Sequence, residues 1–157
     1  MQKKFILVWV SVMMFLLSSG LCSAAPMETI KADESVTAAV GNFLKKAPDM
    51  SFYRFTLKAV NGVLQTGSPE YVILDVRDKE DFVVEHIPTA INVPLAMIPD
   101  KLGAIPLNKP IYVIAAVDCD SAYATFALRL LGYHAYMIPG GEPAWKEAGF
   151  QLVSGAK

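Results

Sequence analysis

The side chains best suited to nucleophilic chemistry form one short run in the second half of the chain. Cys119 lies between Asp118 and Asp120, and Ser121 follows at once. A thiolate gains reactivity when a helix N-terminus lowers its pKa, whereas flanking carboxylates raise the pKa and disfavour the charged form. We expect the helix to begin at Ser121, so Cys119 would lie in the loop before it, and the two acids would outweigh the helix. Cys119 is therefore a candidate nucleophile with unfavourable neighbours; a redox thiol and an inert loop cysteine are the alternatives.

Three further candidates follow an apolar run in the middle of the chain: Asp75, Arg77 and His86. Asp75 and Arg77 could assist catalysis, and His86 could be a general base or a metal ligand, but structural roles are commoner for such residues. We expect Asp75 and Arg77 to pair with each other's neighbours, or to cap residues 78–84, and so to shape the rim of a site. We expect His86 to be a hydrogen-bonded structural residue.

No metal site and no cofactor are predicted. Three consecutive side chains at 118–120 cannot all face one ion at tetrahedral angles. The pair Gly140-Gly141 with Trp145 indicates a tight turn and a core anchor for the last helix rather than a phosphate loop.

Composition narrows the class of protein. The 157 residues carry 14 Lys and Arg against 15 Asp and Glu, a formal charge of −1. This balance, with 54% hydrophobic residues, excludes a polycationic nucleic-acid binder and a disordered tail protein. The mean hydropathy of +0.38 is high because apolar residues are concentrated at the N-terminus.

The first 24 residues have the plan of a secretory signal peptide. Lys3 and Lys4 precede the uncharged apolar run 5–17, and small residues lead to a cleavage site after Ala24. We expect export to a bacterial periplasm and a soluble mature chain. An uncleaved membrane anchor over 5–25 and lipidation at Cys22 are the alternatives, although the bulky Leu21 disfavours the second.

Cleavage after Ala24 changes the mature chain in two ways. Loss of Lys3 and Lys4 changes the formal charge from −1 to −3. Loss of Cys22 leaves Cys119 as the only thiol, which excludes an internal disulfide despite the oxidising compartment. The remaining chain must fold by burial alone, and its length permits this.

The mature chain alternates strand-like and helix-like segments after a linker and a short helix over 25–49. This order predicts an α/β fold, an open and mainly parallel sheet of about five strands with helices on both faces. Ligands should then gather at the loops 77–80 and 116–120, which follow two buried strands. Strands are expected at 52–56, 71–76, 90–93, 111–115 and 134–138; helices are expected at 36–47, 57–65, 79–84, 95–102, 121–131 and 142–148.

Several short motifs, taken in order, resemble the rhodanese homology domain. The first half of the likeness is Ile73–Arg77 (ILDVR), Asp81-Phe82 and His86–Pro94 (HIPTAINVP). The second half is the apolar helix from Ser121 to Gly132-Tyr133, then Pro139–Trp145 (PGGEPAW) and Gly149-Phe150. The resemblance covers residues 50–155, nearly all of the mature chain.

The resemblance implies a particular loop in members that are enzymes. There a Cys at the end of a strand takes a sulfane sulfur from thiosulfate, holds it as a persulfide and passes it to a thiol or cyanide. Four residues follow this Cys, an Arg-Ser pair then opens a helix, and backbone N–H groups of the loop surround the anion.

In this chain the corresponding loop lacks both residues. Aligned on Ser121 and Gly132, Ala115 takes the place of the nucleophile and Asp120 that of the Arg. Asp118 stands where a Gly is usual, so we expect backbone strain there. The other loop positions, Ala116 and Val117, carry no reactive group.

The sequence therefore predicts an exported rhodanese-like module without conventional sulfurtransferase activity. Its partner would be an unknown exported protein, or an anionic or small thiol or sulfur compound, and not nucleic acid. A membrane would be involved only if the signal segment were uncleaved or lipidated. The alternative is a divergent sulfurtransferase, or a persulfide or redox carrier, that uses Cys119.

Overall fold

One parallel sheet organises the protein in the computed structural model, which describes residues 33–47 and 55–155. The strands lie in the order β2 (Ile91–Asn92), β1 (Val72–Asp75), β3 (Ile111–Ile114) and β4 (Ala135–Met137), and every pair is parallel. The central strands β1 and β3 pair Leu74 with Val113, and β3 is buried at all four positions. Near-continuous apolar runs of this kind are typical of parallel strands covered on both faces.

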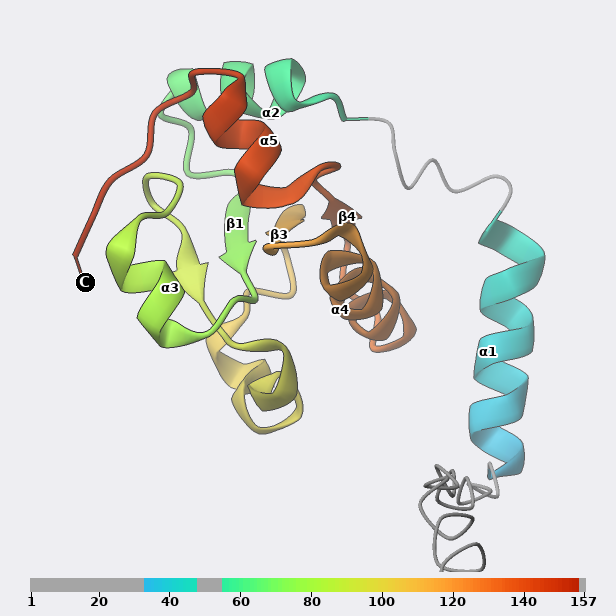
Figure 1. Ribbon diagram of the computed structural model, residues 1–157. Coiled ribbons are helices and arrows are strands. Elements are labelled where there is room, and N and C mark those ends of the chain that lie inside the picture. Colours follow the sequence, from blue (N-terminus) through green and yellow to red (C-terminus); the bar gives the residue numbers. More distant parts are fainter. Residues whose placement is uncertain (1–32, 48–54, 156–157) are drawn as a thin grey trace, which may run out of the picture. The chain divides into compact units, whose positions relative to one another are not determined.

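Alternate residues of the central strands enter two different cores. Leu74 and Val113 pack in one core with Leu128, whereas Ile73 and Ile114 pack in the other. The second core also holds Val60, Phe82 and Trp145, which come from helices. The predicted α/β sheet with helices on both faces is thus confirmed (Figure 1).

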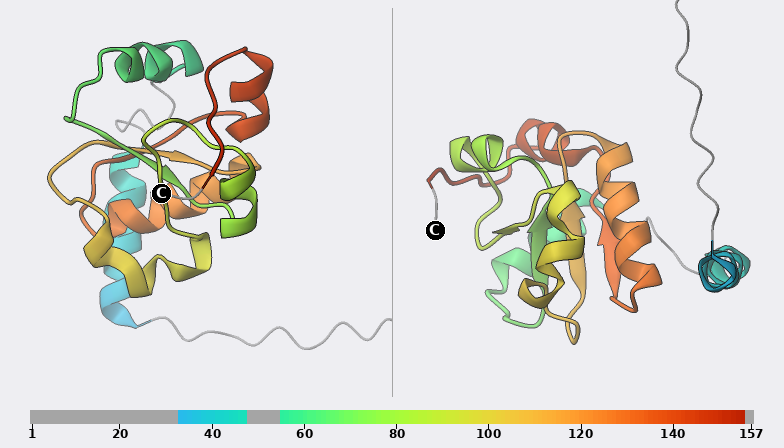
Figure 2. Two further views of the ribbon diagram at one scale, coloured as in Figure 1. Left: turned by 90° about the vertical axis from the view of Figure 1, so that its left-hand side faces the viewer. Right: turned by 90° about the horizontal axis from the view of Figure 1, so that it is seen from below.

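The helices divide between these faces, with α2 and α5 opposite α4, as the left-hand view of Figure 2 shows. Thr56 caps α2 by accepting a hydrogen bond from the Ala59 N–H at 3.2 Å. The helices of this part are α2 (Leu57–Gln65), α3 (Lys79–Val84), the 3-10 helices η2 (Leu95–Met97) and η3 (Pro99–Ala104), α4 (Asp118–Leu130) and α5 (Gly141–Glu147).

Three predictions for these elements need correction. Within the described ranges the sheet has four strands and not about five; of the expected strand 52–56, residues 55–56 are irregular and the rest lies outside those ranges. The segment 95–102 forms 3-10 turns because Pro99 starts a new helix and Lys101 has non-helical dihedrals. The helix expected from Ser121 begins three residues earlier, at Asp118.

The N-terminal part of the chain contributes one further described helix, α1 (Glu34–Lys46). Its buried residue is Phe43, whose ring meets that of Phe126 on α4 edge to face at 4.8 Å. The predicted signal segment 1–24 and its cleavage site lie outside the described residues. Among the helices that the structure describes, none has the length and hydropathy to span a membrane.

Candidate functional site

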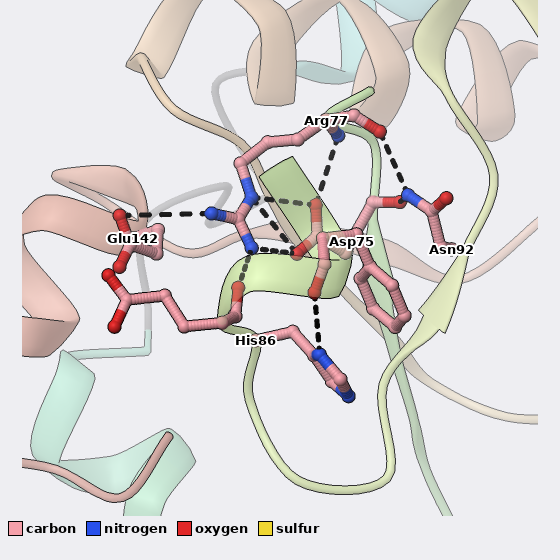
Figure 3. Close-up of polar contacts among 7 residues, drawn as sticks. Asp75, Arg77, His86, Asn92 and Glu142 are labelled. Carbon is pink, nitrogen blue, oxygen red and sulfur yellow. Dashed lines mark hydrogen bonds and ion pairs between the residues drawn. The ribbon is translucent and has the colours of Figure 1, made fainter. Parts of the chain in front are cut away.

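A buried ion pair occupies the carboxyl end of β1. Asp75 is fully buried, and its carboxylate accepts three side-chain hydrogen bonds from Arg77 (Figure 3). Nε donates to Oδ1 at 3.0 Å and to Oδ2 at 3.1 Å, and Nη2 donates to Oδ2 at 2.6 Å. The Arg77 main-chain N–H also donates to Oδ1, at 3.0 Å. Burial lowers the pKa of Arg77, but the hydrogen bonds and charge of Asp75 more than compensate, and the net pKa is raised.

The guanidinium of Arg77 also joins other elements to this pair. Its Nη2 donates to the main-chain oxygen of Glu85 at 2.7 Å, and Nη1 lies 3.8 Å from the Glu142 carboxylate at the start of α5. The Asn92 side chain, on β2, donates to the carbonyls of Asp75 and Arg77 at 3.1 and 2.8 Å (Figure 3). Asp75 and Arg77 therefore tie the edge strand and α5 to the centre of the sheet.

The predicted roles of Asp75 and Arg77 are thus partly wrong. They bond to each other rather than only to each other's neighbours, because the turn after β1 returns the Arg77 side chain onto the carboxylate two residues before it. Neither side chain caps 78–84: Asp78 is at the cap position, and it makes no side-chain capping bond.

His86 has the structural setting expected of it. The side chain is buried, Nδ1 lies 2.7 Å from the Phe82 carbonyl, and the ring stacks on Phe82 with centroids 3.8 Å apart. Because a carbonyl only accepts, Nδ1 carries the proton. The His86 main chain forms an antiparallel bridge with Val153, both hydrogen bonds being 2.8 Å.

Glu142 is a site residue that sequence reasoning missed. Its Oε1 is buried and has no hydrogen-bond partner within the described residues. Burial raises the pKa of Glu142, and nearby Glu85 raises it further, against the opposing effect of Arg77. The pKa of Glu85 is lowered, chiefly by its hydrogen bond to Lys146. The only signal in the sequence was an acid directly after Gly140-Gly141.

The loop between β3 and α4 consists of only Ala115, Ala116 and Val117. Ala115 is 1% exposed, and its carbonyl accepts a hydrogen bond from the Glu142 N–H at 2.9 Å. Ala116 and Val117 are exposed. Gly141 packs against this loop at a φ of +62°, and a Cβ there would lie 2.5 Å from the Ala115 oxygen. The loop is therefore held tightly against the start of α5.

Asp118 does not have the strained backbone expected of it. It is the first residue of α4, and among the described non-glycine residues only Thr89 has a positive φ. Its Oδ1 accepts a hydrogen bond from the Gly140 N–H at 2.7 Å, and its carbonyl accepts one from the buried Ser121 hydroxyl at 3.0 Å. Asp118 and Asp120 place two carboxylates in the first turn, where they stabilise the helix dipole and favour an early helix start.

Cys119 is consequently a first-turn residue of α4 and not a loop residue before the helix. Its side chain is exposed, and Sγ lies 3.9 Å from Oδ1 of Asp120. No group of three His, Cys, Asp or Glu side chains suited to a metal ion occurs in 33–47 or 55–155. The structure thus gathers Asp75, Arg77 and Glu142 into one network, and holds Ala115 against it through Glu142.

The fold and the geometry of this site define an α/β domain of the rhodanese type. The family model described as Rhodanese-like domain matches residues 60–148, more than half of the chain. The chain belongs to the rhodanese-like domain family.

Solved structures of the same kind agree with this assignment. A rhodanese-like domain protein from Staphylococcus aureus is 30% identical, with a TM-score of 0.57, covering 64% of this chain and 97% of that one. The rhodanese-like domain of the Alr3790 protein from Anabaena sp. is 27% identical, with a TM-score of 0.58, covering 64% of this chain and 77% of that one.

The similar curated proteins are longer. The adenylyltransferase and sulfurtransferase UBA4 of Lodderomyces elongisporus is 32% identical over 114 residues, which is 66% of this chain and 25% of that protein. The HTH-type transcriptional regulator Rv0324 of Mycobacterium tuberculosis is 30% identical over 93 residues, 55% of this chain and 39% of that protein. The chain spans a quarter or less of the length of the UBA4 relatives from three yeasts.

Proposed function

We propose that this protein is an exported rhodanese-like module that binds a partner without conventional thiosulfate:thiol sulfurtransferase activity. The observation that carries the proposal is Ala115. It occupies the position that the resemblance assigns to the nucleophile, and its methyl group cannot hold sulfur. The partner is an exported protein, or a small anionic, thiol or sulfur compound.

The charges around this position also disfavour the conventional donor. Asp118 and Asp120 lie in the first turn of α4, where an enzyme of this type would receive a thiosulfate dianion. Replacing Arg by Asp at 120 and adding Asp118 changes the local charge by about three units, and each like charge near a partly desolvated anion is repulsive. The Asp118 carboxylate also accepts a hydrogen bond from the Gly140 N–H, so this main-chain donor is already used and is not free for an anion.

Sulfur loading tests the proposal directly. Protein purified from cells that express the full chain is incubated with thiosulfate, and intact mass is measured for a gain of about 32 Da, one sulfur atom. We expect no gain in the wild type and a gain in the double variant Ala115→Cys/Asp120→Arg, together with thiocyanate formation from cyanide. The matched control Ala115→Ser/Asp120→Arg has nearly the same shape without the added thiol and should stay inactive.

Two results would contradict this proposal. Thiosulfate-dependent thiocyanate production by the wild type would show that the protein is a conventional enzyme. A double variant that folds normally, by circular dichroism, and takes up no sulfur would show that Ala115 is not at the nucleophile position.

The exposed thiol of Cys119 supports a second candidate, a persulfide or redox carrier. Its thiolate would attack the outer sulfur of a polysulfide; the S–S bond breaks, the shortened polysulfide leaves with the electron pair, and Cys119 keeps one sulfur. A mass gain after polysulfide treatment that is absent from Cys119→Ser would favour the persulfide carrier. A Cys119-dependent band on a non-reducing gel of envelope extract would favour a mixed-disulfide role.

Export is proposed from the signal-like segment 1–24. The mass of the protein recovered from the periplasmic fraction should correspond to an N-terminus at Ala25. A protein that retains Met1 and stays with the membrane fraction would refute cleavage, and a lipid-sized mass gain on Cys22 would indicate a lipoprotein.

A further inference from the structure

A hollow lies beside the edge strand β2. It has a volume of about 360 Å³, and none of its lining residues belongs to the loop 115–117, α4 or α5. Its other sides are formed by α3, which follows β1 in the chain, and by η3. It is lined by Lys79, Phe82 and Val83 of α3, by Ala90, by Ile91 and Asn92 of β2, and by Lys101 of η3.

Two lining residues are held in place by other parts of the protein. Asn92 donates its amide hydrogens to the carbonyls of Asp75 and Arg77 (Figure 3). Phe82 stacks on the buried ring of His86, and its carbonyl lies 2.7 Å from His86 Nδ1. A ligand in the hollow would therefore meet fixed side chains, and binding would cost little ordering of the protein there.

The lining combines an apolar wall with positive charge. Phe82, Val83 and Ile91 supply apolar surface, and the only charged lining residues are Lys79 and Lys101. Both lysines are exposed, and neither forms an ion pair within the described residues. The acids that neighbour them in sequence do not line the hollow, so the charged groups of its lining are both positive.

We propose that this hollow binds a small organic anion with an apolar body, of the class of medium-chain carboxylates. The body lies on Phe82 and Ile91, and the carboxylate meets the ammonium groups of Lys79 and Lys101. A small molecule fits better than a peptide for two reasons. The volume is at the lower end of the range for small-molecule sites, about 300–1,000 Å³. The edge strand β2 has only two residues, too few for an added peptide strand.

Octanoate is the probe for the test, with octan-1-ol as the uncharged analogue. Amide shifts in a heteronuclear NMR titration of the protein, purified from cells expressing the full chain, should saturate around Phe82 and Asn92. The double variant Lys79→Gln/Lys101→Gln should weaken octanoate binding by about fivefold, the loss expected for two exposed ion pairs. The matched control Lys45→Gln/Lys58→Gln removes two other exposed lysines and should leave the affinity unchanged.

Each of three results would overturn the proposal: equal affinity for octan-1-ol and octanoate, equal loss in the two lysine variants, or shifts confined to residues outside the hollow. An extended acidic peptide that displaces octanoate and binds more tightly would assign the hollow to a protein partner instead. The proposal does not depend on the function proposed above, because sulfur loading on Ala115→Cys or Cys119 leaves Lys79 and Lys101 untouched.

Discussion

Replacement of Arg77 by Met should be the most damaging single change near the site. Asp75 is fully buried, and within the described residues its carboxylate then keeps a single hydrogen-bond donor, the main-chain N–H of residue 77. Removing one partner of a buried ion pair costs about 3–5 kcal/mol, because the remaining charge is uncompensated. With a urea dependence of about 2 kcal/mol per molar, the unfolding midpoint should fall by about 1.5–2.5 M.

Two further variants decide whether the reasoning holds. The double variant Asp75→Leu/Arg77→Met removes both charges and should recover most of the lost free energy of unfolding. Lys146→Met, which removes an exposed partner of Glu85, should change the midpoint little. A double variant as unstable as Arg77→Met alone would show that lost packing, and not the unpaired carboxylate, causes the loss of stability. A decrease of less than about 1 kcal/mol in the free energy of unfolding of Arg77→Met would refute the ion-pair account altogether.

Two other predictions concern the start of α5. Because burial raises the pKa of Glu142, ionising this carboxyl lowers the stability of the folded protein as the pH rises above the ordinary carboxyl range. Glu142→Gln should therefore become more stable relative to wild type between about pH 4 and pH 7. Urea midpoints that show a larger gain at the acid end of this range would contradict the prediction. Gly141→Ala should lower the free energy of unfolding by about 2–3 kcal/mol, because of the positive φ and the contact of a Cβ with the Ala115 oxygen. Gly62→Ala, in open space on α2, should raise it by about 0.5–1 kcal/mol, and urea unfolding of both variants checks the contrast.

Local patterns in the sequence predicted most of the elements. The bounds expected for 57–65 and 79–84 match α2 and α3, because each helix is bracketed by turn signals that act over a few residues. The start of α4 was placed too late because Ser121 was taken as the first helical residue. The acids at 118 and 120 are themselves favourable in a first turn, which is a local signal that could have been used.

The site could be predicted only in part, because its contacts join segments distant in sequence. Asp75 and Arg77 are close in the chain, so their pairing was within reach of sequence reasoning. The contact of Glu142 with Arg77 exists because parallel strands bring the segments after β1 and β4 to the same edge of the sheet. No spacing or periodicity in the sequence encodes which of several acids will be brought there.

Trp145 gives this arrangement an optical signal of its own. The indole is fully buried, and its Nε1 donates a hydrogen bond to the Gln151 carbonyl at 3.1 Å. Trp145 is the only tryptophan inside the described ranges, since the other, Trp9, lies in the N-terminal segment. It stands on the same short helix as Glu142, one turn further along. Its emission wavelength and quenching will therefore register any loosening of α5, so disturbance at the carboxyl edge of the sheet can be followed without an attached dye.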